Sequence, residues 1–256
     1  MLGLRKYDLR KLNSMTKYPS IPTYHGIGNK GLLTDEVLDL PEHVVFTEKV
    51  DGANSRVIIT PDGFLIGSRD ELLYAQDDLI ENPILGIVES LKDVATRLKA
   101  TVTTGKFMVF FFETYGGNTT KASKQYTKHR NLGVRLFDIA GFDYDAMKDW
   151  ELEKFSGWRD RGGQDFFCEE GLKYHAEYHK LDLTPRLQAG PVPTAHADVL
   201  EWLKATIATT RCKIDHDAMG KPEGVVVRSP DRSFIAKIRY EDYERHLRKV
   251  NDVRQS

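Results

Sequence analysis

The run Lys106-Phe-Met-Val-Phe-Phe-Phe-Glu113 constrains the fold of this chain more than any other segment. Six consecutive apolar residues are far too few to span a membrane. A strand that is buried on both faces of a sheet has this continuous apolar character. Gly133-Val-Arg-Leu-Phe-Asp138 is similar, so we expect both runs to form central strands.

Further patterns complete a mixed fold. Shorter strand-like runs lie at residues 44–46, 56–60, 64–67, 224–228 and 233–239, with turn signals at 61–63 and 229–232. Apolar residues at helical spacing predict helices over 86–99, about 199–207 and about 240–250. We therefore expect an α+β fold, dominated by antiparallel strands, with a single domain over residues 1–256.

Composition narrows the class of protein. The 256 residues are 40% hydrophobic and 29% charged, which is typical of a globular chain. The net charge of -1 means that a nucleic-acid partner would need a local basic patch. Two cysteines, Cys168 and Cys212, form no disulfide framework, and no signal-peptide core or membrane-length apolar run is present. We expect a cytoplasmic protein (in the host cytoplasm if the source is viral) with no membrane partner.

Lys49 is the candidate nucleophile. It lies in Phe46-Thr-Glu-Lys-Val-Asp-Gly-Ala-Asn54, where a strand-like stretch meets an Asp-Gly pair. An exposed lysine before a turn is the simpler interpretation. Four later segments favour chemistry instead: a strand ending in Glu113, the pair Phe137-Asp138, Glu223-Gly-Val-Val-Val-Arg228, and Lys237-Ile-Arg239, whose two cations share one strand face. Each alone fits a structural role, but their order with Lys49 does not look accidental.

This ordered set resembles the covalent nucleotidyltransferase superfamily, which comprises ATP-dependent DNA ligases, RNA ligases and mRNA capping enzymes. The resemblance covers about residues 44–240 and implies antiparallel sheets flanked by helices, with a nucleotide pocket between the sheets. Most DNA ligases and capping enzymes carry arginine five residues after the lysine, whereas this chain has Asn54. Asn54, together with Arg69 in Gly67-Ser-Arg69, resembles the RNA ligase 2 family.

The resemblance implies a three-step reaction. Lys49 attacks the α-phosphorus of ATP to form lysyl-AMP, AMP passes to a 5′-phosphate, and a 3′-hydroxyl displaces it. Lys237, Arg239 and a bound metal would favour the neutral, nucleophilic amine and stabilise phosphate charge. The implied nucleotide contacts are Lys237 on the α-phosphate, Glu113 on the ribose and Phe137 on adenine, with Glu48 and Arg239 also counted among the nucleotide-binding residues.

The implied cofactors and partners follow from this chemistry. Mg²⁺ is the natural ion beside ATP, with Mn²⁺ as an alternative, and Glu223 is the expected carboxylate near it. Asn54 and Arg69 would face the phosphate of the nucleic-acid end. The expected partner is RNA with 5′-phosphate and 3′-hydroxyl ends, with a nicked duplex as one form, and the protein is expected to be a monomer.

Two alternatives stay open: a minimal ATP-dependent DNA ligase, and a nucleic-acid end-binding module that does not react. Only residues 240–256 follow Arg239, too few for the OB-fold domain of DNA ligases and capping enzymes. We therefore expect no C-terminal OB-fold domain, and the motifs support self-adenylylation more directly than strand sealing.

Three other features have weaker functional interpretations. Gly26-Ile-Gly28-Asn-Lys-Gly31 matches a dinucleotide motif but lacks the preceding strand, and the spacing of His175 and His179 lacks a third zinc ligand. Two basic clusters could bind nucleic acid or simply be solvated: Lys121, Lys124, Lys128, His129, Arg130 and Arg135 with Tyr126 interleaved, and Arg245, His246, Arg248 and Lys249.

Overall fold

A seven-stranded antiparallel sheet forms the larger layer of the molecule. We describe the protein from a computed structural model that covers residues 3–100 and 106–255. The strand order is β10-β9-β8-β4-β5-β6-β7. The strands are β4 (Ala53–Thr60), β5 (Gly63–Ser68), β6 (Leu72–Ala75), β7 (Asp78–Leu79), β8 (Phe107–Gly116), β9 (Leu132–Phe142) and β10 (Asp165–Phe166).

The run of six apolar residues forms most of β8, between β9 and β4 in the middle of this sheet. Its odd-numbered residues Phe107, Val109 and Phe111 enter one core, and its even-numbered residues enter another on the opposite face. Both predicted central strands are therefore confirmed, and burial on two faces explains the absence of alternation.

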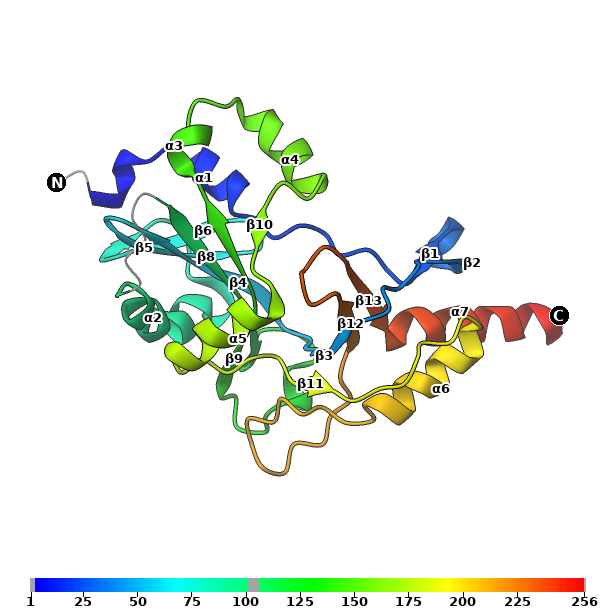
Figure 1. The fold of residues 1–256 in the computed structure, drawn as a ribbon. Helices are drawn as coiled ribbons and strands as arrows, with labels where there is room; N and C mark the ends of the chain where they lie inside the picture. The colour runs from blue at the N-terminus through cyan, green and yellow to red at the C-terminus, as the bar shows by residue number, and fades with distance from the viewer. Residues whose placement is uncertain (1–2, 101–105, 256) are drawn as a thin grey trace.

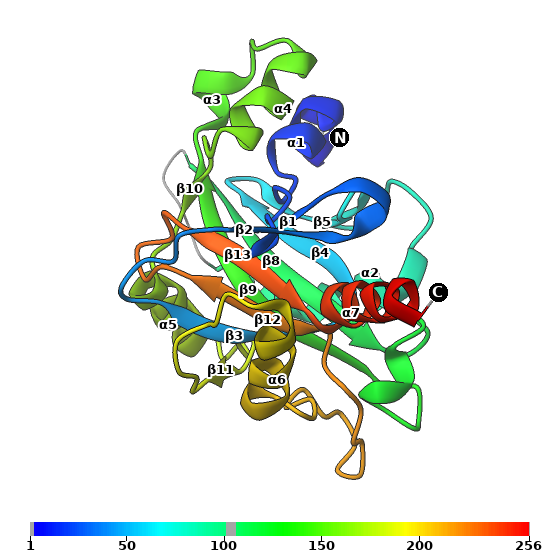
Figure 2. The ribbon, with the colours of Figure 1, turned by 90° about the vertical axis from the view of Figure 1, so that its right-hand side faces the viewer.

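A four-stranded sheet in the order β11-β3-β12-β13 forms the second layer. Its strands are β3 (Val45–Lys49), β11 (Arg186–Leu187), β12 (Gly224–Arg228) and β13 (Ile235–Arg239). One face of this sheet packs against α6 (His196–Thr206) and α7 (Tyr240–Gln255) through a third core that includes Val225, Val227 and Ile238. Its other face turns towards the larger sheet, as the two views of the ribbon show (Figures 1 and 2).

Helices cover one face of the larger sheet and one end of its other face. One face carries α2 (Ile87–Leu98), which begins after the turn η3 (Ile84–Gly86), and α5 (Glu169–Tyr178). The other face carries η1 (Gly3–Lys6), α1 (Leu9–Met15), α3 (Tyr144–Met147) and α4 (Leu152–Asp160) at one end (Figure 1). A hairpin of β1 (His25–Ile27) and β2 (Leu33–Val37) and the turns η2 (Asn29–Gly31) and η4 (Ser123–Gln125) complete the fold.

The three expected helices are present as α2, α6 and α7, with α6 beginning before residue 199 and α7 extending beyond residue 250. The mixed α+β class with antiparallel sheets is confirmed. Helices α1, α3, α4 and α5 were not predicted. None of the helices within the described ranges has the length and apolar character needed to cross a bilayer. The single-domain boundary stays a prediction.

Candidate active site

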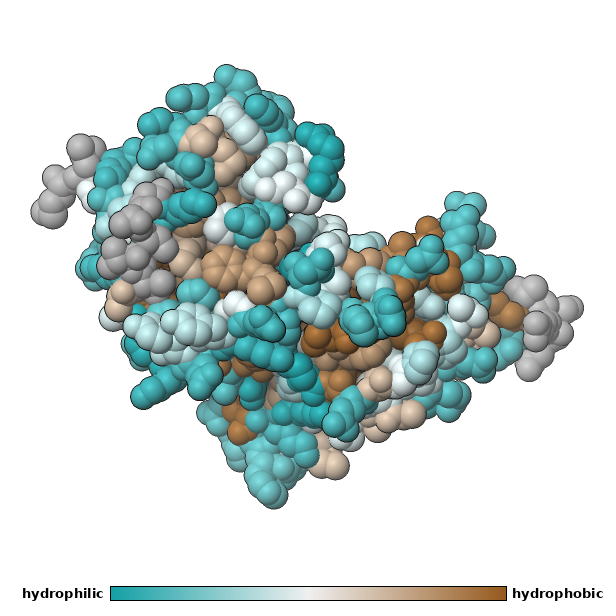
Figure 3. All heavy atoms as spheres, in the orientation of Figure 1, coloured by the Kyte–Doolittle hydropathy of each residue, from teal (hydrophilic) through white to brown (hydrophobic). Residues whose placement is uncertain are grey.

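A cavity of about 510 Å³ lies between the two sheets and collects most of the predicted site residues. Its walls come from β3 and the following turn, from β4, β8 and β9 of the larger sheet, and from β12 and β13 of the smaller one. Predicted site residues in the lining are Glu48, Lys49, Asn54, Arg69, Glu113, Phe137, Glu223 and Lys237. In the space-filling view, hydrophobic residues gather in the middle of the face between the two layers, within a largely hydrophilic surround (Figure 3).

Lys49 ends β3 and projects into this cavity. Its strand partner on β12 is Gly224, which brings Glu223 beside it. The Lys49 Nζ lies 2.5 Å from Glu223 Oε2, and both side chains are largely buried, at 23% and 20% exposure. Lys49 is therefore not the exposed lysine before a turn that the simpler interpretation predicts. The amine is held at the wall of a cavity by a carboxylate from the neighbouring strand.

The turn after Lys49 has no room for a side chain at Gly52. The Gly52 amide donates to Glu113 Oε1 at 3.1 Å, and the Asp51 amide donates to the Tyr126 hydroxyl at 2.7 Å. A Cβ on Gly52 would lie 2.3 Å from the Thr114 carbonyl oxygen. Only glycine allows this close approach of the turn to β8, so Lys49 and Glu113 are positioned by the same backbone contact.

Two carboxyl groups near Lys49, those of Glu113 and Asp51, have raised pKa values. Burial raises the pKa of Glu113 to about 7, while the positive charge of Lys49 opposes the rise. Burial and then the negative charge of Glu223 raise the pKa of Asp51. Acidic groups crowded in this way favour a cation between them. Perturbed titration inside a cavity is typical of functional sites.

Lys237 faces the same cavity from β13. Burial lowers its pKa, and the positive charges of Arg239 and Lys49 lower it further. Arg239 is two residues on but is not part of the cavity lining. Its guanidinium donates to Asp242 at 2.8 and 2.9 Å and lies 3.8 Å from Glu223. Lys237 is therefore positioned to contact a phosphate in the cavity, whereas Arg239 lies outside the cavity lining, next to Glu223.

Phe137 reaches the cavity because β9 carries a bulge. Phe111 pairs with Asp138 and Phe112 pairs with Leu136, which leaves Phe137 as the extra residue. Leu136 and Ile139 enter the core beneath α2, so the two residues between them, Phe137 and Asp138, both turn to the opposite face. A regular strand would have sent one of the two away from the cavity.

Asn54 and Arg69 lie at the edge of the cavity where β4 begins and β5 ends. The Asn54 Oδ1 atom is buried and has no hydrogen-bond partner within the described part of the chain. Arg69 is exposed. An unpartnered polar atom and an exposed guanidinium at one edge are suited to a polar ligand.

Glu48 borders the cavity, but its carboxylate points elsewhere. It accepts hydrogen bonds from the Thr210 hydroxyl and from the Arg211 amide, the latter at 2.8 Å. The residue is 1% exposed. Strand alternation explains this, because Lys49 and Thr47 face the cavity and Glu48 lies between them. A nucleotide contact from the Glu48 carboxylate would require these bonds to break, and its predicted role stays a prediction.

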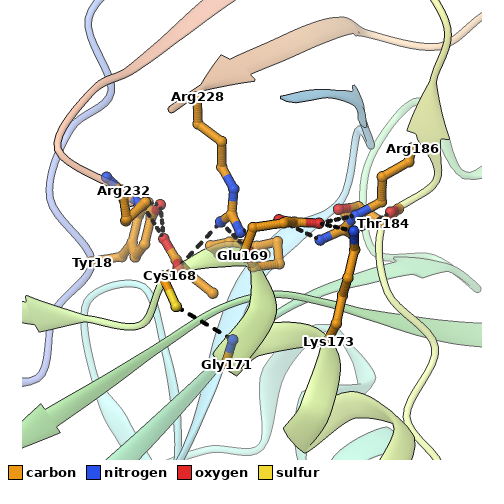
Figure 4. Close-up of polar contacts among 11 residues, drawn as sticks. Tyr18, Cys168, Glu169, Gly171, Lys173, Thr184, Arg186, Arg228 and Arg232 are labelled. Atoms are coloured by element: carbon orange, nitrogen blue, oxygen red, sulfur yellow. Dashed lines mark hydrogen bonds and ion pairs between the residues drawn. The ribbon is translucent and has the colours of Figure 1, made fainter. Parts of the chain in front are cut away.

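A buried ion-pair network at the back of the cavity was missed by sequence reasoning (Figure 4). Arg228, on β12 of the smaller sheet, lies 3.4 Å from Asp138 and 2.5 Å from Glu169 at the start of α5. Asp138 also accepts from Arg232 at 2.7 Å and from the Tyr18 hydroxyl at 2.8 Å. Arg186 completes the network at Glu169. These contacts join the two sheets, and Tyr18 and Arg228 line the cavity.

The site fits a divalent cation that is held partly by protein carboxylates and partly by phosphate oxygens of a bound nucleotide. No cluster of three or more His, Cys, Asp or Glu side chains within residues 3–100 and 106–255 could hold a metal alone. Glu223 is nonetheless present beside Lys49, with Asp51 close enough for its pKa to rise. One or two carboxylates combined with phosphate oxygens are typical of magnesium sites.

The basic cluster around residue 126 needs a correction. Tyr126 is fully buried, and its hydroxyl accepts a hydrogen bond from the Asp51 amide. It therefore cannot stack on a base at the surface. Lys128 forms an ion pair with Asp217. His175 lies on α5 and His179 caps its C-terminal end, and both rings contact Phe110. His179 is buried, so the two residues are not the ordinary surface histidines that the spacing suggested.

Comparisons with known proteins agree with this geometry. A family model described as RNA ligase matches residues 42–239, which is more than half of the chain. Among curated proteins, none matches. Solved structures of an RNA ligase from Naegleria gruberi share the fold. These matches confirm the predicted resemblance and the nucleotidyltransferase fold.

The structural likeness is distant and partial. A variant of the Naegleria enzyme with ATP and Mn gives a TM-score of 0.52 at 14% identity, covering 80% of this chain and 52% of that one. A variant with AMP and Mn gives 0.52 at 15%, covering 90% and 64%. A variant without ligand gives 0.54 at 15%, covering 80% and 51%. The chain spans between 51% and 64% of the length of these enzymes.

Proposed function

The chain belongs to the RNA ligase family, and from that premise we propose that it is an ATP-dependent RNA ligase that works through lysyl-AMP. The observation that carries the proposal is the position of Lys49, an amine held at the wall of a nucleotide-sized cavity between a carboxylate and a second cation. The Naegleria structures with ATP or AMP support a nucleotide in the corresponding fold.

In the first step the neutral Lys49 amine attacks the α-phosphorus of ATP. The N–P bond forms as the bond to pyrophosphate breaks, and the amine proton leaves. Glu223 is the nearest acceptor for that proton, with its Oε2 atom 2.5 Å from Nζ. Lys237, which lacks an ion pair within the described residues, is free to neutralise charge that develops on the α-phosphate.

The nucleotide is held by residues from both sheets. Phe137 offers a ring face for adenine, and Glu113 offers a carboxyl group for the ribose hydroxyls, with its position set by the Gly52 amide. A divalent cation would be held by Glu223 together with phosphate oxygens, and would supply charge neutralisation at the phosphates. Mn accompanies the nucleotide in the Naegleria structures, and Mg²⁺ is our proposal for this protein.

In the later steps AMP passes to the 5′-phosphate of an RNA end, and a 3′-hydroxyl then displaces it. Asn54 and Arg69, at the edge of the cavity, are the proposed contacts for that 5′-phosphate. Arginine suits the role because its guanidinium can donate two parallel hydrogen bonds to one phosphate. A cytoplasmic location and a monomeric state are also proposals, and they rest on the sequence alone.

Labelling with ATP tests the first step. Incubation with α-labelled ATP and Mg²⁺ should leave an acid-labile label on the protein, and Lys49→Ala should abolish it. Lys99→Ala, at the exposed lysine that caps the C-terminal end of α2, is the matched control and should label fully. No label on the wild-type protein, or full label on Lys49→Ala, would show that the proposed mechanism is wrong.

A panel of ends tests the substrate. The labelled protein is mixed with 5′-phosphorylated RNA and DNA, each as a single strand and in a nicked duplex. Transfer of AMP and sealing should be faster with RNA at the reacting end. A clear preference for all-DNA nicks would replace the proposal with a DNA ligase.

A further inference from the structure

A second groove opens beside the candidate active site and has no part in the chemistry above. It has a volume of about 840 Å³ and is walled by α2 on one side and by the loop between β8 and β9 on the other. Leu85 borders both this groove and the cavity that holds Lys49, so the two spaces are adjacent there. We call it the Arg130 groove, after its only lining arginine.

The loop that forms one wall is held firmly by its backbone. The Gly117 amide donates to the Asn131 carbonyl at 2.8 Å. Asp215 accepts from the Lys128 amide at 2.5 Å, from the His129 amide at 3.3 Å and from the Asn131 side chain at 3.3 Å. These bonds fix the segment on both sides of Arg130.

Arg130 itself is left available. It is exposed, and within residues 3–100 and 106–255 its guanidinium has no ion pair or hydrogen bond. Its backbone has a φ of 59°, in the left-handed region that costs a non-glycine residue about 1 kcal/mol or more. Leu85, on the facing wall, has the same φ of 59°. Strained residues of this kind concentrate at functional sites.

The chemistry of the walls indicates what kind of ligand fits. Asn118, Asn131 and Ser90 offer neutral polar groups, and Leu85, Leu132 and Ile214 offer apolar surface. None of the lining residues is aromatic, so bases would find no stacking platform. A cation with neutral polar groups and small apolar surfaces suits a sugar-phosphate backbone.

We propose that the Arg130 groove binds the backbone of the RNA strand that leads away from the end in the active site. The proposal rests on the proposed ligase function, because that function requires a strand to leave the cavity past its edge. Leu85 marks the place where the groove lies next to the cavity. Glu89, the acidic member of the lining, lies on the α2 wall. Its negative charge would repel phosphates from that wall, so they would bind on the side of the loop that carries Arg130.

Binding of RNA without ATP tests the groove independently of the reaction. The probe is a fluorescent single-stranded RNA with a 5′-phosphate, measured by anisotropy at several salt concentrations. Arg130→Gly should fold because glycine accepts the left-handed backbone. Loss of one phosphate contact should weaken binding severalfold and reduce the slope of log K against log salt by about 0.7. Asn118→Glu, which adds a negative charge to the groove, should also weaken binding.

Two controls decide the outcome. Arg10→Ala, at an exposed arginine on α1, should bind RNA like the wild type. The loss in Arg130→Gly should be equal for RNA with a 5′-phosphate and RNA with a 5′-hydroxyl, because the groove holds the strand and not its end. Wild-type affinity and slope in both groove variants, or a loss confined to the 5′-phosphate, would overturn the proposal. A wild-type protein that fails to label with ATP would instead refute the ligase function and leave this binding result to be judged on its own.

Discussion

Replacing Asp138 with asparagine removes one negative charge from a site that is sealed from water. Asp138 is 0% exposed. Its carboxylate accepts from Arg232 Nε at 2.7 Å and from the Tyr18 hydroxyl at 2.8 Å, and it lies 3.4 Å from Arg228 Nη1. Asparagine keeps the size of the side chain and one acceptor oxygen, so the change tests charge and not volume.

The size of the effect follows from the charges that are left. The side chains of Arg228 and Arg232 are 3% and 6% exposed. After the substitution Arg228 still pairs with Glu169, whereas Arg232 loses its carboxylate partner. Glu169 already binds Arg186. Removing one partner from a buried ion pair costs about 3–5 kcal/mol, because the other charge stays buried without compensation. At roughly 2–4 °C per kcal/mol for a chain of this length, Tm should fall by roughly 6–20 °C.

Thermal and urea unfolding followed by circular dichroism measure the change. Asp149→Asn, at an exposed aspartate, is the matched control and should shift the free energy of unfolding by less than about 0.5 kcal/mol. The double variant with Arg232→Gln should lose less than the two single losses combined, because it removes both partners of one pair. A loss below about 1 kcal/mol in Asp138→Asn would show that water or relaxation compensates Arg228 and Arg232, and that the buried-charge argument fails.

Three further predictions concern residues around the cavity. Gly52→Ala should reduce self-adenylylation at least tenfold because its Cβ would meet the Thr114 carbonyl, whereas Gly141→Ala, where an added Cβ has no atom within 4 Å, should label normally. Burial raises the pKa of Glu113 to about 7 from an ordinary 4.5, so the folded protein holds a proton that the unfolded chain releases, and stability falls as pH rises through that window. Glu113→Gln should remove about 2 kcal/mol of this decline, measured by urea unfolding at pH 5 and pH 7.5. Asp242→Asn should cost about 2–3 kcal/mol in the same assay, because Arg239 and Arg245 both lose a charged hydrogen-bond partner that is 1% exposed.

Much of the fold could be predicted from the sequence because some buried segments have a recognisable pattern of apolar residues. The apolar run in β8 and the helical spacing in α2 each mark an element whose partners are all hydrophobic. Helices α1 and α5 have no such pattern. Each buries only two or three side chains, such as Leu12 and Met15 in α1. Their formation depends on packing against the large sheet, which a local pattern does not contain.

The candidate site was predicted where a motif is local and missed where contacts are distant. Lys49 and Glu223 were assigned from their motifs, and strand pairing brings them together across 174 residues of sequence. The carboxylate of Glu48 turns to Thr210 and Arg211, which lie in a segment with no recognisable signal. Alternation along β3 predicts that Lys49 and Glu48 face opposite sides, but it does not say what lies on the second side.

The bulge in β9 joins the candidate nucleotide cavity to the buried ion-pair network. It places Phe137 and Asp138 on one face, so the ring that borders the cavity is followed directly by the acid that anchors the network. Tyr18 contacts both, with its ring 4.9 Å from that of Phe137 and its hydroxyl 2.8 Å from Asp138. Since Tyr18 and Arg228 also line the cavity, loosening of the network should misplace the surface on which adenine is proposed to stack. Asp138→Asn should therefore weaken ATP binding at temperatures where the protein is still folded. Unchanged affinity would show that Phe137 is held by its hydrophobic neighbours alone.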